Sequence, residues 1–344
     1  MERSTKTILS SLQKRYKRLA AFLFLLFLIL GTWHILSGKS FRTSEGRVFG
    51  TTYHICYQSS QDLDADIRRA MKEVDEALSM FNDSSTLSAF NRGEESPRNA
   101  CFDAVVSNAL EISRITDGAF DITVAPLVNL WGFGFKHREN VTSQEVDSIR
   151  QFVGYKHLSY NRRQGLVRHN PHVTLDCGAI AKGYAVDHVA QALYKKGCRN
   201  YMVEIGGEVV ARGKNPQRER WSVGIAKPVD DSTGINTQLQ QIIHITDCAV
   251  ATSGNYRNFY YQGQRKVSHT IDPSTGYPVA HGLLSATVIA PSCMTADAYA
   301  TAFMVMGLES AKHLVENNDR LKAFFIYSDS IGTLQTWQSA NFPH

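Results

Sequence analysis

The chain has 344 residues, of which 43% are hydrophobic and 20% are charged, so it has the composition of a globular protein with a sizeable core. Its net charge of +5 comes from the N-terminus, because residues 1–40 hold seven Lys and Arg against one Glu and the remainder has a net charge of −1. This distribution excludes a basic surface for nucleic acid in the body of the protein.

The first predicted element is an apolar helix. After a basic tail over residues 1–18, the 18 residues from Leu19 to Leu36 contain no Lys, Arg, Asp or Glu. As a helix the stretch is roughly 27 Å long, close to the apolar thickness of a bilayer. Because positive charge stays on the cytoplasmic side, residues 19–37 are predicted as a transmembrane signal-anchor, with residues 1–18 in the cytoplasm. A cleaved signal peptide is the alternative, although no A-x-A-like site is evident.

A polar linker is predicted over residues 38–45, followed by one domain over 46–344 without an internal break. Apolar residues at helical spacing predict helices at 63–81, 102–116, 140–154, 181–196, 296–306 and 310–317. Segments rich in β-branched and aromatic residues predict strands at 48–57, 173–175, 201–210, 221–226, 241–246, 265–271, 284–290 and 323–327. Because strands and helices do not alternate regularly, the pattern predicts an α+β fold with a mixed or antiparallel sheet and flanking helices.

The six cysteines do not point to a cofactor. No two form a C-x-x-C pair, and no His residues cluster beside them, which argues against a zinc site or a redox dithiol. Disulfides are possible outside the cytoplasm, but their pairing cannot be read from sequence. The default expectation is that the cysteines are small buried residues.

A glycine-containing turn precedes the helix at 181–196. Gly178 and Gly183 bracket this strand-to-helix turn, which exposes backbone amides and a positive helix end that suit a phosphate. Lys182 adds a positive charge. A tight turn with a solvated lysine is the plainer interpretation.

Asp297 and Thr301 are four residues apart on a predicted helix, so their side chains share one face. A carboxylate and a hydroxyl are hard oxygen ligands of the kind that Mg²⁺ prefers. The alternatives are an acid placed by the helix dipole and a core threonine.

His269 and Asp272 lie at the end of a predicted strand, before a Pro-Gly turn. A histidine there could act as a base oriented by a carboxylate, and a hydrogen-bonded surface histidine is the alternative. Asp121, beside Phe120, could meet the polar edge of a cofactor, or could belong to a helix end that runs into a buried loop.

Seven segments in this order resemble the ApbE family of FAD:protein FMN transferases. They are FGTTY from Phe49, DGAFDITVAPLVNLWGFG from Asp117, DCGAIAKGYAVD from Asp176, EIGGE from Glu204, ATSGNY from Ala251, SHTIDPSTG from Ser268 and ADAYAT from Ala296. The resemblance covers about Phe49 to Gly307 and implies a T-fold-like α+β architecture.

The resemblance also implies roles for particular residues. Mg²⁺ would be bound by the Ala179 backbone oxygen, Asp297 and Thr301, with Asp297 also catalytic. Our own hypothesis is that His269 is the second catalytic residue, the base that takes the proton of the acceptor hydroxyl. The residues implied for FAD are Phe49, Phe81, Ala119, Phe120, Asp121, Asp176, Lys182 and Ile271. Phe49 stands where the family often has Met, and Phe81 where Tyr may be found. Ala300 occupies the place of a second carboxylate in some members, so one metal ion is better supported than two.

The implied activity is magnesium-dependent transfer of FMN from FAD to a Thr or Ser hydroxyl of an acceptor protein, with release of AMP. Acceptors of the family carry FMN-binding domains, as do subunits of Nqr- and Rnf-type respiratory complexes. The domain would then lie on the periplasmic side of a bacterial inner membrane. Two alternatives share the site: a magnesium-dependent FAD pyrophosphatase, and a non-catalytic flavin-binding membrane protein.

Overall fold

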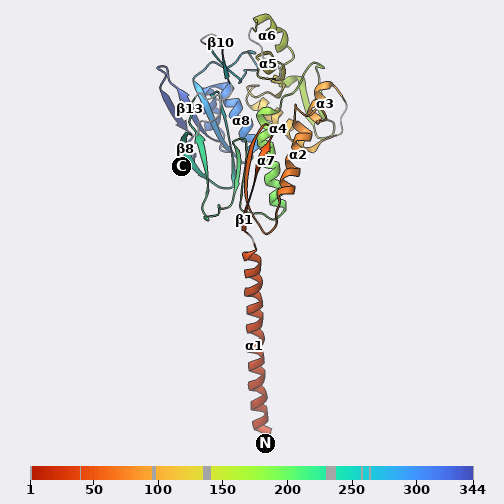
Figure 1. The fold of residues 1–344 in the computed structure, drawn as a ribbon, viewed down its shortest axis with the longest axis vertical. Helices are drawn as coiled ribbons and strands as arrows, with labels where there is room; N and C mark the ends of the chain where they lie inside the picture. The colour runs from red at the N-terminus through yellow and green to blue at the C-terminus, as the bar shows by residue number, and fades with distance from the viewer. Residues whose placement is uncertain are drawn as a thin grey trace.

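The structure, a computed structural model, describes residues 2–38, 40–94, 98–134, 141–229, 238–256, 259–262 and 265–343. Helix α1 (Glu2–Ser37) projects as a single long helix from a body formed by the remaining elements (Figure 1). Its described apolar side chains are exposed, as in Phe27, which is 75% exposed. Within the described residues, no helix combines the length and the apolar character needed to cross a membrane. The predicted anchor over 19–37 is therefore not found among them, and its residues 33–37 lie outside the described side chains.

The body is built on an eight-stranded sheet in which every pair of neighbouring strands is antiparallel. This confirms the predicted α+β class with an antiparallel sheet. In spatial order the strands are β1 (Ser40–Val48), β2 (Thr51–Ser59), β5 (Tyr201–Ile205), β6 (Glu208–Arg212), β9 (Cys248–Gly254), β12 (Leu283–Ala290), β13 (Lys322–Ser328) and β14 (Leu334–Gln338).

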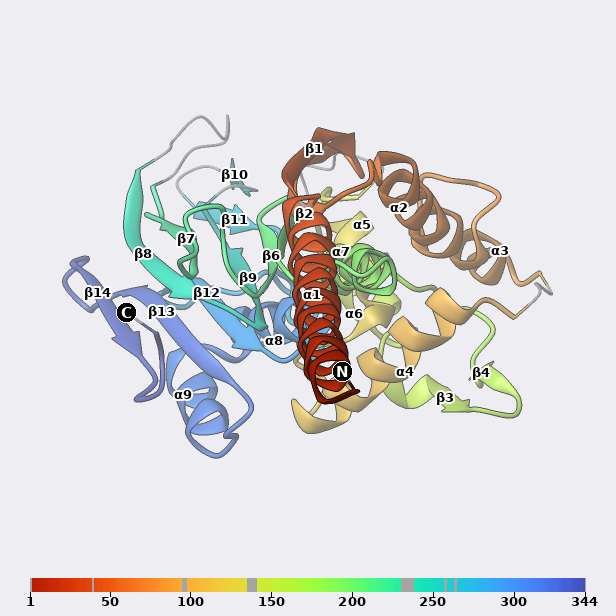
Figure 2. The ribbon, with the colours of Figure 1, turned by 90° about the horizontal axis from the view of Figure 1, so that it is seen from below.

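Both faces of this sheet are buried, because successive side chains of a strand point to opposite faces. On β13, Ala323 and Phe325 belong to the larger core, whereas Phe324 and Ile326 belong to a second core on the other face. The larger core is covered by helices α2 (Asp64–Leu78), α4 (Ala100–Ile115), α7 (Gly178–Lys195) and α8 (Cys293–Met306). The second is covered by the hairpin of β7 (Trp221–Ala226) and β8 (Leu239–Ile245). Figure 2 shows these helices and this hairpin on opposite sides of the body.

Two sequence predictions are corrected at the sheet. The predicted linker over 38–45 largely forms edge strand β1, because its polar backbone pairs along its whole length with β2. The strand predicted over 201–210 is a hairpin, β5 and β6, joined by Gly206 and Gly207. Both glycines have positive φ angles, 64° and 101°, that turn the chain.

The remaining elements surround this frame. The strand predicted at 173–175 does not form. The others are α3 (Thr86–Arg92), the 3-10 turns Ile122–Val124 and Tyr155–His157, α5 (Ala125–Leu130), α6 (Ser143–Arg150), α9 (Leu308–Glu316), and the hairpins β3 (Leu158–Asn161) with β4 (Gly165–Arg168) and β10 (Phe259–Gln262) with β11 (Arg265–Ser268).

All six cysteines are free, and four are buried, as expected of small core residues. Every residue of the three core clusters lies between Phe41 and Phe342, so α1 contributes nothing to them. A fragment that begins at Ser40 therefore retains the whole described core.

Candidate active site

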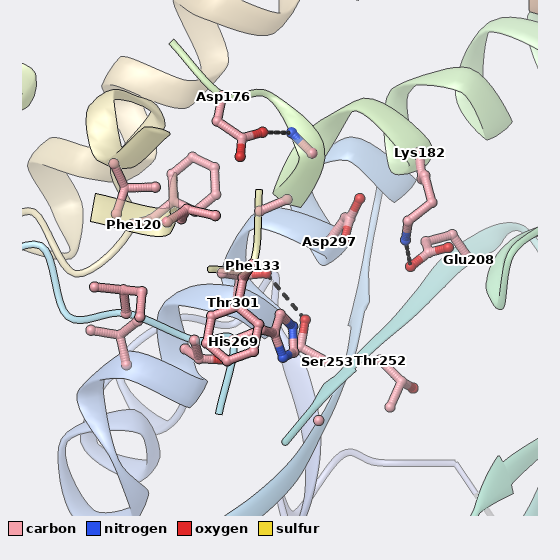
Figure 3. A pocket seen from close by; sticks show the side chains of 18 of the residues that line it. Phe120, Phe133, Asp176, Lys182, Glu208, Thr252, Ser253, His269, Asp297 and Thr301 are labelled. Atoms are coloured by element: carbon pink, nitrogen blue, oxygen red, sulfur yellow. Dashed lines mark hydrogen bonds and ion pairs between the residues drawn. The ribbon is translucent and has the colours of Figure 1, made fainter. Parts of the chain in front are cut away.

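A cavity of about 490 Å³ opens between the helical layer and the ends of the central strands β6 and β9, near the N-terminal end of α7 (Figure 3). Its lining comes from segments far apart in the sequence, including α7, α8, β6, β7, β9 and the loop after β11. The predicted site residues that it brings together are Ala119, Phe120, Asp121, Asp176, Ala179, Lys182, His269, Ile271, Asp297 and Thr301.

Asp297 is placed by close contact between α7 and α8. Its Oδ2 accepts a hydrogen bond of 2.9 Å from the amide of Gly183, and the residue is only 3% exposed. A Cβ atom at Gly183 would lie 2.4 Å from the carbonyl oxygen of Cys293, so only glycine allows this approach. Burial raises the pKa of Asp297, opposed by the charge of Lys182 and by the Gly183 amide.

Oxygen atoms suited to a hard cation gather beside Asp297. Thr301 lies one turn further along α8, and its hydroxyl is 3.1 Å from that of Ser253 on β9. Ala179, in the first turn of α7, lines the same cavity, so its carbonyl oxygen belongs to the same neighbourhood. Within the described residues no three His, Cys, Asp or Glu side chains cluster to hold a metal. The predicted set differs in kind, since it consists of one carboxylate, one hydroxyl and one carbonyl, which are all ligands that Mg²⁺ accepts.

Lys182 lies between two acids, Asp297 and Glu208, in the lining of the cavity. Its Nζ is 2.5 Å from Oε1 of Glu208, the first residue of β6. Burial lowers the pKa of Lys182, but the charges of Asp297 and Glu208 outweigh it, so the net shift is upward and the amine stays charged. Burial raises the pKa of Glu208, with Lys182 opposing the shift.

Two further acids shape the loops around the cavity. Asp121 is buried, and its carboxylate accepts bonds from the amide and hydroxyl of Thr123 and from the amide of Tyr155. Asp176 accepts a bond of 2.7 Å from the amide of Gly178 at the start of α7. Burial raises the pKa of both carboxyls. Asp121 thus holds the cavity wall through the hydrogen bonds of its carboxylate.

His269 lies in the apolar part of the lining. The ring of Phe133 meets its imidazole edge-on, with centroids 6.3 Å apart. Phe120 and Ile271, both buried, line the same cavity. His269 therefore lines the same cavity as Asp297 and Thr301 of α8. The imidazole and these two oxygen-bearing side chains can contact one substrate.

Two predicted FAD contacts lie outside the lining of this cavity. Phe49 sits in the β1–β2 turn with a positive φ of 51° and is half-buried against the larger core. Phe81 follows α2 and is 83% exposed. These positions do not test whether Phe49 or Phe81 contacts FAD.

Sequence reasoning missed three residues. Glu208 and Ser253 lie within the recognised segments EIGGE and ATSGNY, which were given no individual roles. Asp187 closes the segment DCGAIAKGYAVD, and its two carboxylate oxygens each accept a bond of 2.9 Å, from the amides of Cys293 and Met294. It thereby fixes the start of α8 on α7. The segments themselves were the available signal, but the contacts of these residues, across 26 to 107 residues of sequence, needed the fold.

Solved structures with the same fold place this chain in the flavin-transferase class of enzymes. The structure of flavin transferase ApbE from Vibrio cholerae superposes with a TM-score of 0.79 at 36% identity, covering 88% of this chain and 98% of that chain. The ApbE protein of Thermotoga maritima superposes with a TM-score of 0.76 at 27% identity and the same coverage. The ApbE family model matches residues 49–325, and this chain belongs to the ApbE family.

Relatives named FAD:protein FMN transferase agree with this assignment. The Vibrio cholerae protein is 40% identical over 284 residues, which are 79% of this chain and 84% of that protein. The Escherichia coli K12 protein is 37% identical over 290 residues, which are 83% and 79% of the two chains.

Proposed function

We propose that this enzyme moves FMN from FAD to a Thr or Ser hydroxyl of an acceptor protein and releases AMP. The observation that carries the proposal is the single cavity that joins Asp297, Thr301, Lys182 and His269 in a chain of the ApbE family. Charged and oxygen-bearing groups suit the pyrophosphate of FAD, and the apolar wall around Phe133 suits one of its rings.

The donor set fits a magnesium ion. Asp297 commits Oδ2 to Gly183, so its second oxygen can serve as a ligand together with the Thr301 hydroxyl and the Ala179 carbonyl. Bound Mg²⁺ would neutralise charge on the phosphoryl oxygens. Ala300 is a buried apolar neighbour on α8, so the described residues support one ion at this place.

The chain's own groups then have distinct tasks. A ring nitrogen of His269 takes the proton of the acceptor hydroxyl as its oxygen forms a bond to the FMN phosphorus. The bond between that phosphorus and the bridging oxygen breaks, and the oxygen leaves with AMP. Lys182 offsets negative charge on the phosphates, and the cavity holds the reacting groups in line.

The location of the enzyme belongs to the same proposal. The described apolar side chains of α1 between Leu19 and Leu30 are exposed, and basic residues precede them. They support attachment of α1 to a bacterial inner membrane, with the body on the periplasmic side. Acceptors there would be proteins with FMN-binding domains, such as subunits of Nqr- and Rnf-type complexes.

The test combines a fragment of residues 40–344 with FAD, Mg²⁺ and an FMN-binding-domain protein from the same organism. Intact-mass spectrometry follows the acceptor, and chromatography follows AMP. The proposal requires an FMN-sized gain in acceptor mass that disappears with EDTA. Steady AMP release without a mass gain would instead identify a FAD pyrophosphatase. FAD binding without either product would identify a flavin-binding protein.

A further inference from the structure

The end of the body that receives α1 carries a concentration of positive charge. Two segments, 195–200 and 212–220, lie side by side there, because the amide of Lys214 donates a hydrogen bond of 2.8 Å to the side chain of Asn200. Together they form the basic end of the body. Their single acid is Glu219, and their exposed basic residues are Lys195, Lys196, Arg199, Lys214, Arg218 and Arg220. This excess is local, since the chain after residue 40 has a net charge of −1.

Most of these exposed charges have no acidic partner. Within the described residues, only Lys196 among the six forms an ion pair, at 3.0 Å with Asp66. Two further acids, Asp62 and Asp247, lie in the turns beside the two segments. Arg212, which is half-buried, adds a seventh basic group next to them. Basic groups therefore still outnumber acids at this end, and the excess charge faces solvent.

Helix α1 enters the body directly beside the basic end. Asn200 is bonded to Gln58 of β2 through main chain and side chain, at 2.9 and 2.7 Å. Ser59, the next residue, pairs with Ser40, where β1 begins. Only three residues separate Ser40 from Leu36, the end of the apolar stretch, so this gap is at most about 14 Å. The basic end therefore lies close to the surface of any bilayer that holds α1.

The cavity opens at the other end of the sheet. Strand β9 begins at Cys248, which pairs with Ala211 beside the basic end. It ends at Gly254 in the cavity lining, about 20 Å further at 3.4 Å per residue. Figure 1 shows α1 joining the body opposite to α5, which contributes Val128 to the lining. A body that rests on lipid through its basic end would present the cavity away from the membrane.

We propose that the basic end docks on anionic phospholipid headgroups and so holds the cavity on the side of the body that faces away from the bilayer. Lys and Arg are attracted to an anionic surface across about a Debye length, roughly 8 Å at physiological ionic strength. The headgroup layer is itself roughly 5–8 Å thick, so the short connection from α1 keeps the basic end within range. This inference rests on the proposed attachment of α1 to a membrane, and not on FMN transfer.

The test uses the full-length chain in lipid nanodiscs made of phosphatidylcholine alone or of phosphatidylcholine mixed with anionic phosphatidylglycerol. Acetylation of lysines, followed by peptide mass spectrometry, compares Lys195 and Lys196 with Lys156, an exposed lysine outside the basic end. We expect acetylation of the first two to be at least about fivefold slower in the anionic discs, with Lys156 unchanged. The difference should vanish at about 1 M salt, where the Debye length falls to about 3 Å.

A pair of double variants separates docking from the local potential of the lipid. Lys214→Gln/Arg218→Gln removes two exposed cations of the basic end and keeps both reporting lysines, so the slowing should fall to less than about twofold. Arg162→Gln/Arg163→Gln removes two exposed cations of the β3–β4 turn and should leave the slowing as in wild type. Thermal melting checks that each variant folds.

Three results would overturn the inference. Equal acetylation in both kinds of disc would exclude lipid docking and leave the basic end to an acidic protein surface. Slowing that persists in Lys214→Gln/Arg218→Gln would come from the potential of the lipid without contact. A chain that separates from the discs would overturn the attachment of α1 as well, while the intact-mass assay would still decide FMN transfer.

Discussion

The carboxylate of Asp297 on α8 accepts a hydrogen bond of 2.9 Å from the backbone amide of Gly183 on α7, across 114 residues of sequence. The two helices can approach this closely because Gly183 has no side chain. Asp297 is thereby brought to the start of α7, beside Lys182 and the Ala179 carbonyl. The position of the proposed metal ligand depends on helix packing as much as on the acid itself.

Gly183→Ala should therefore damage both stability and activity. The new Cβ would lie 2.4 Å from the Cys293 carbonyl oxygen and 2.8 Å from Asp297 Cβ, so α8 must shift. We expect a loss of about 1–3 kcal/mol in the free energy of unfolding, although alanine favours a helix by about 1 kcal/mol over glycine. FMN transfer should fall by about 100-fold, because small displacements of reacting groups are costly.

The matched control is Gly31→Ala, which adds the same methyl group to helix α1, where no atom lies within 4 Å. Because Gly31 lies outside the 40–344 fragment, urea unfolding and the intact-mass assay compare the two variants in the full-length chain in detergent. Wild-type activity in Gly183→Ala would show that the contact does not position Asp297.

Asp297→Asn should abolish transfer while the fold survives. Asparagine can still accept the Gly183 hydrogen bond, and it removes a buried charge whose pKa burial raises. It loses the anionic oxygen proposed for Mg²⁺. We expect transfer to fall by at least about 1,000-fold, and the Mg²⁺ dependence of ADP binding to disappear in calorimetry. Asp187→Asn, a buried acid of the same helix pair outside the cavity lining, should retain that dependence.

Asp187 should make stability depend on pH. Burial raises its pKa to about 6, against the two amide bonds that favour the charged form. An acid whose pKa is higher in the folded state binds more protons there, so the free energy of unfolding falls as pH rises from about 4 to 6.

Asp187→Asn removes this dependence. The difference between wild type and variant should therefore change by about 2.4 kcal/mol between pH 4 and pH 7, because the unfolded carboxyl is already partly ionised at pH 4. Urea unfolding of the 40–344 fragment at both values measures it. Acids that do not interact with Asp187 titrate alike in both proteins and cancel. A constant difference would exclude a raised pKa at Asp187.

His269→Ala should stop FMN transfer without weakening FAD binding. The imidazole is proposed to take a proton only as the acceptor hydroxyl reacts, so its loss falls on turnover, by about 100- to 10,000-fold. Added imidazole should restore part of the rate. His172→Ala, which removes an exposed histidine packed against Phe152, serves as control. Full turnover in the His269 variant would remove this residue from the mechanism.

Phe81→Ala tests whether this exposed ring, which lies outside the cavity lining, contacts FAD. Because Phe81 is 83% exposed, its removal should change the free energy of unfolding by less than about 0.5 kcal/mol. If bound FAD covers the ring, KM for FAD should rise about tenfold, as for roughly 1.4 kcal/mol of lost apolar contact. Ile331→Ala, which truncates a side chain that is 84% exposed, should leave KM unchanged. An unchanged KM in Phe81→Ala would remove it from the FAD site.

Local patterns predicted the regular elements well where one period dominates. The helix predicted at 63–81 is α2 over 64–78, and the strand at 221–226 is β7. Hydrophobic patterns failed to predict strands that pair through their backbone. Strand β1 is polar and therefore resembled a linker. Strand β9 overlaps the motif ATSGNY, which has no strand periodicity. Helix α8 begins at Cys293 and not at the predicted 296, because the Ser292 side chain accepts a hydrogen bond from the amide of Thr295 and caps the helix there.

By itself the sequence determined which residues have the chemistry for a phosphate and a hard cation, and its motifs, which resemble the ApbE family, predicted ten residues that share one cavity. The tertiary structure alone decided how they are used. It placed Gly183 against Asp297, paired Lys182 with Glu208, and left Phe49 and Phe81 outside the cavity lining. The physical reason is that hydrogen bonds and burial depend on distances between segments remote in the chain, which no local pattern contains.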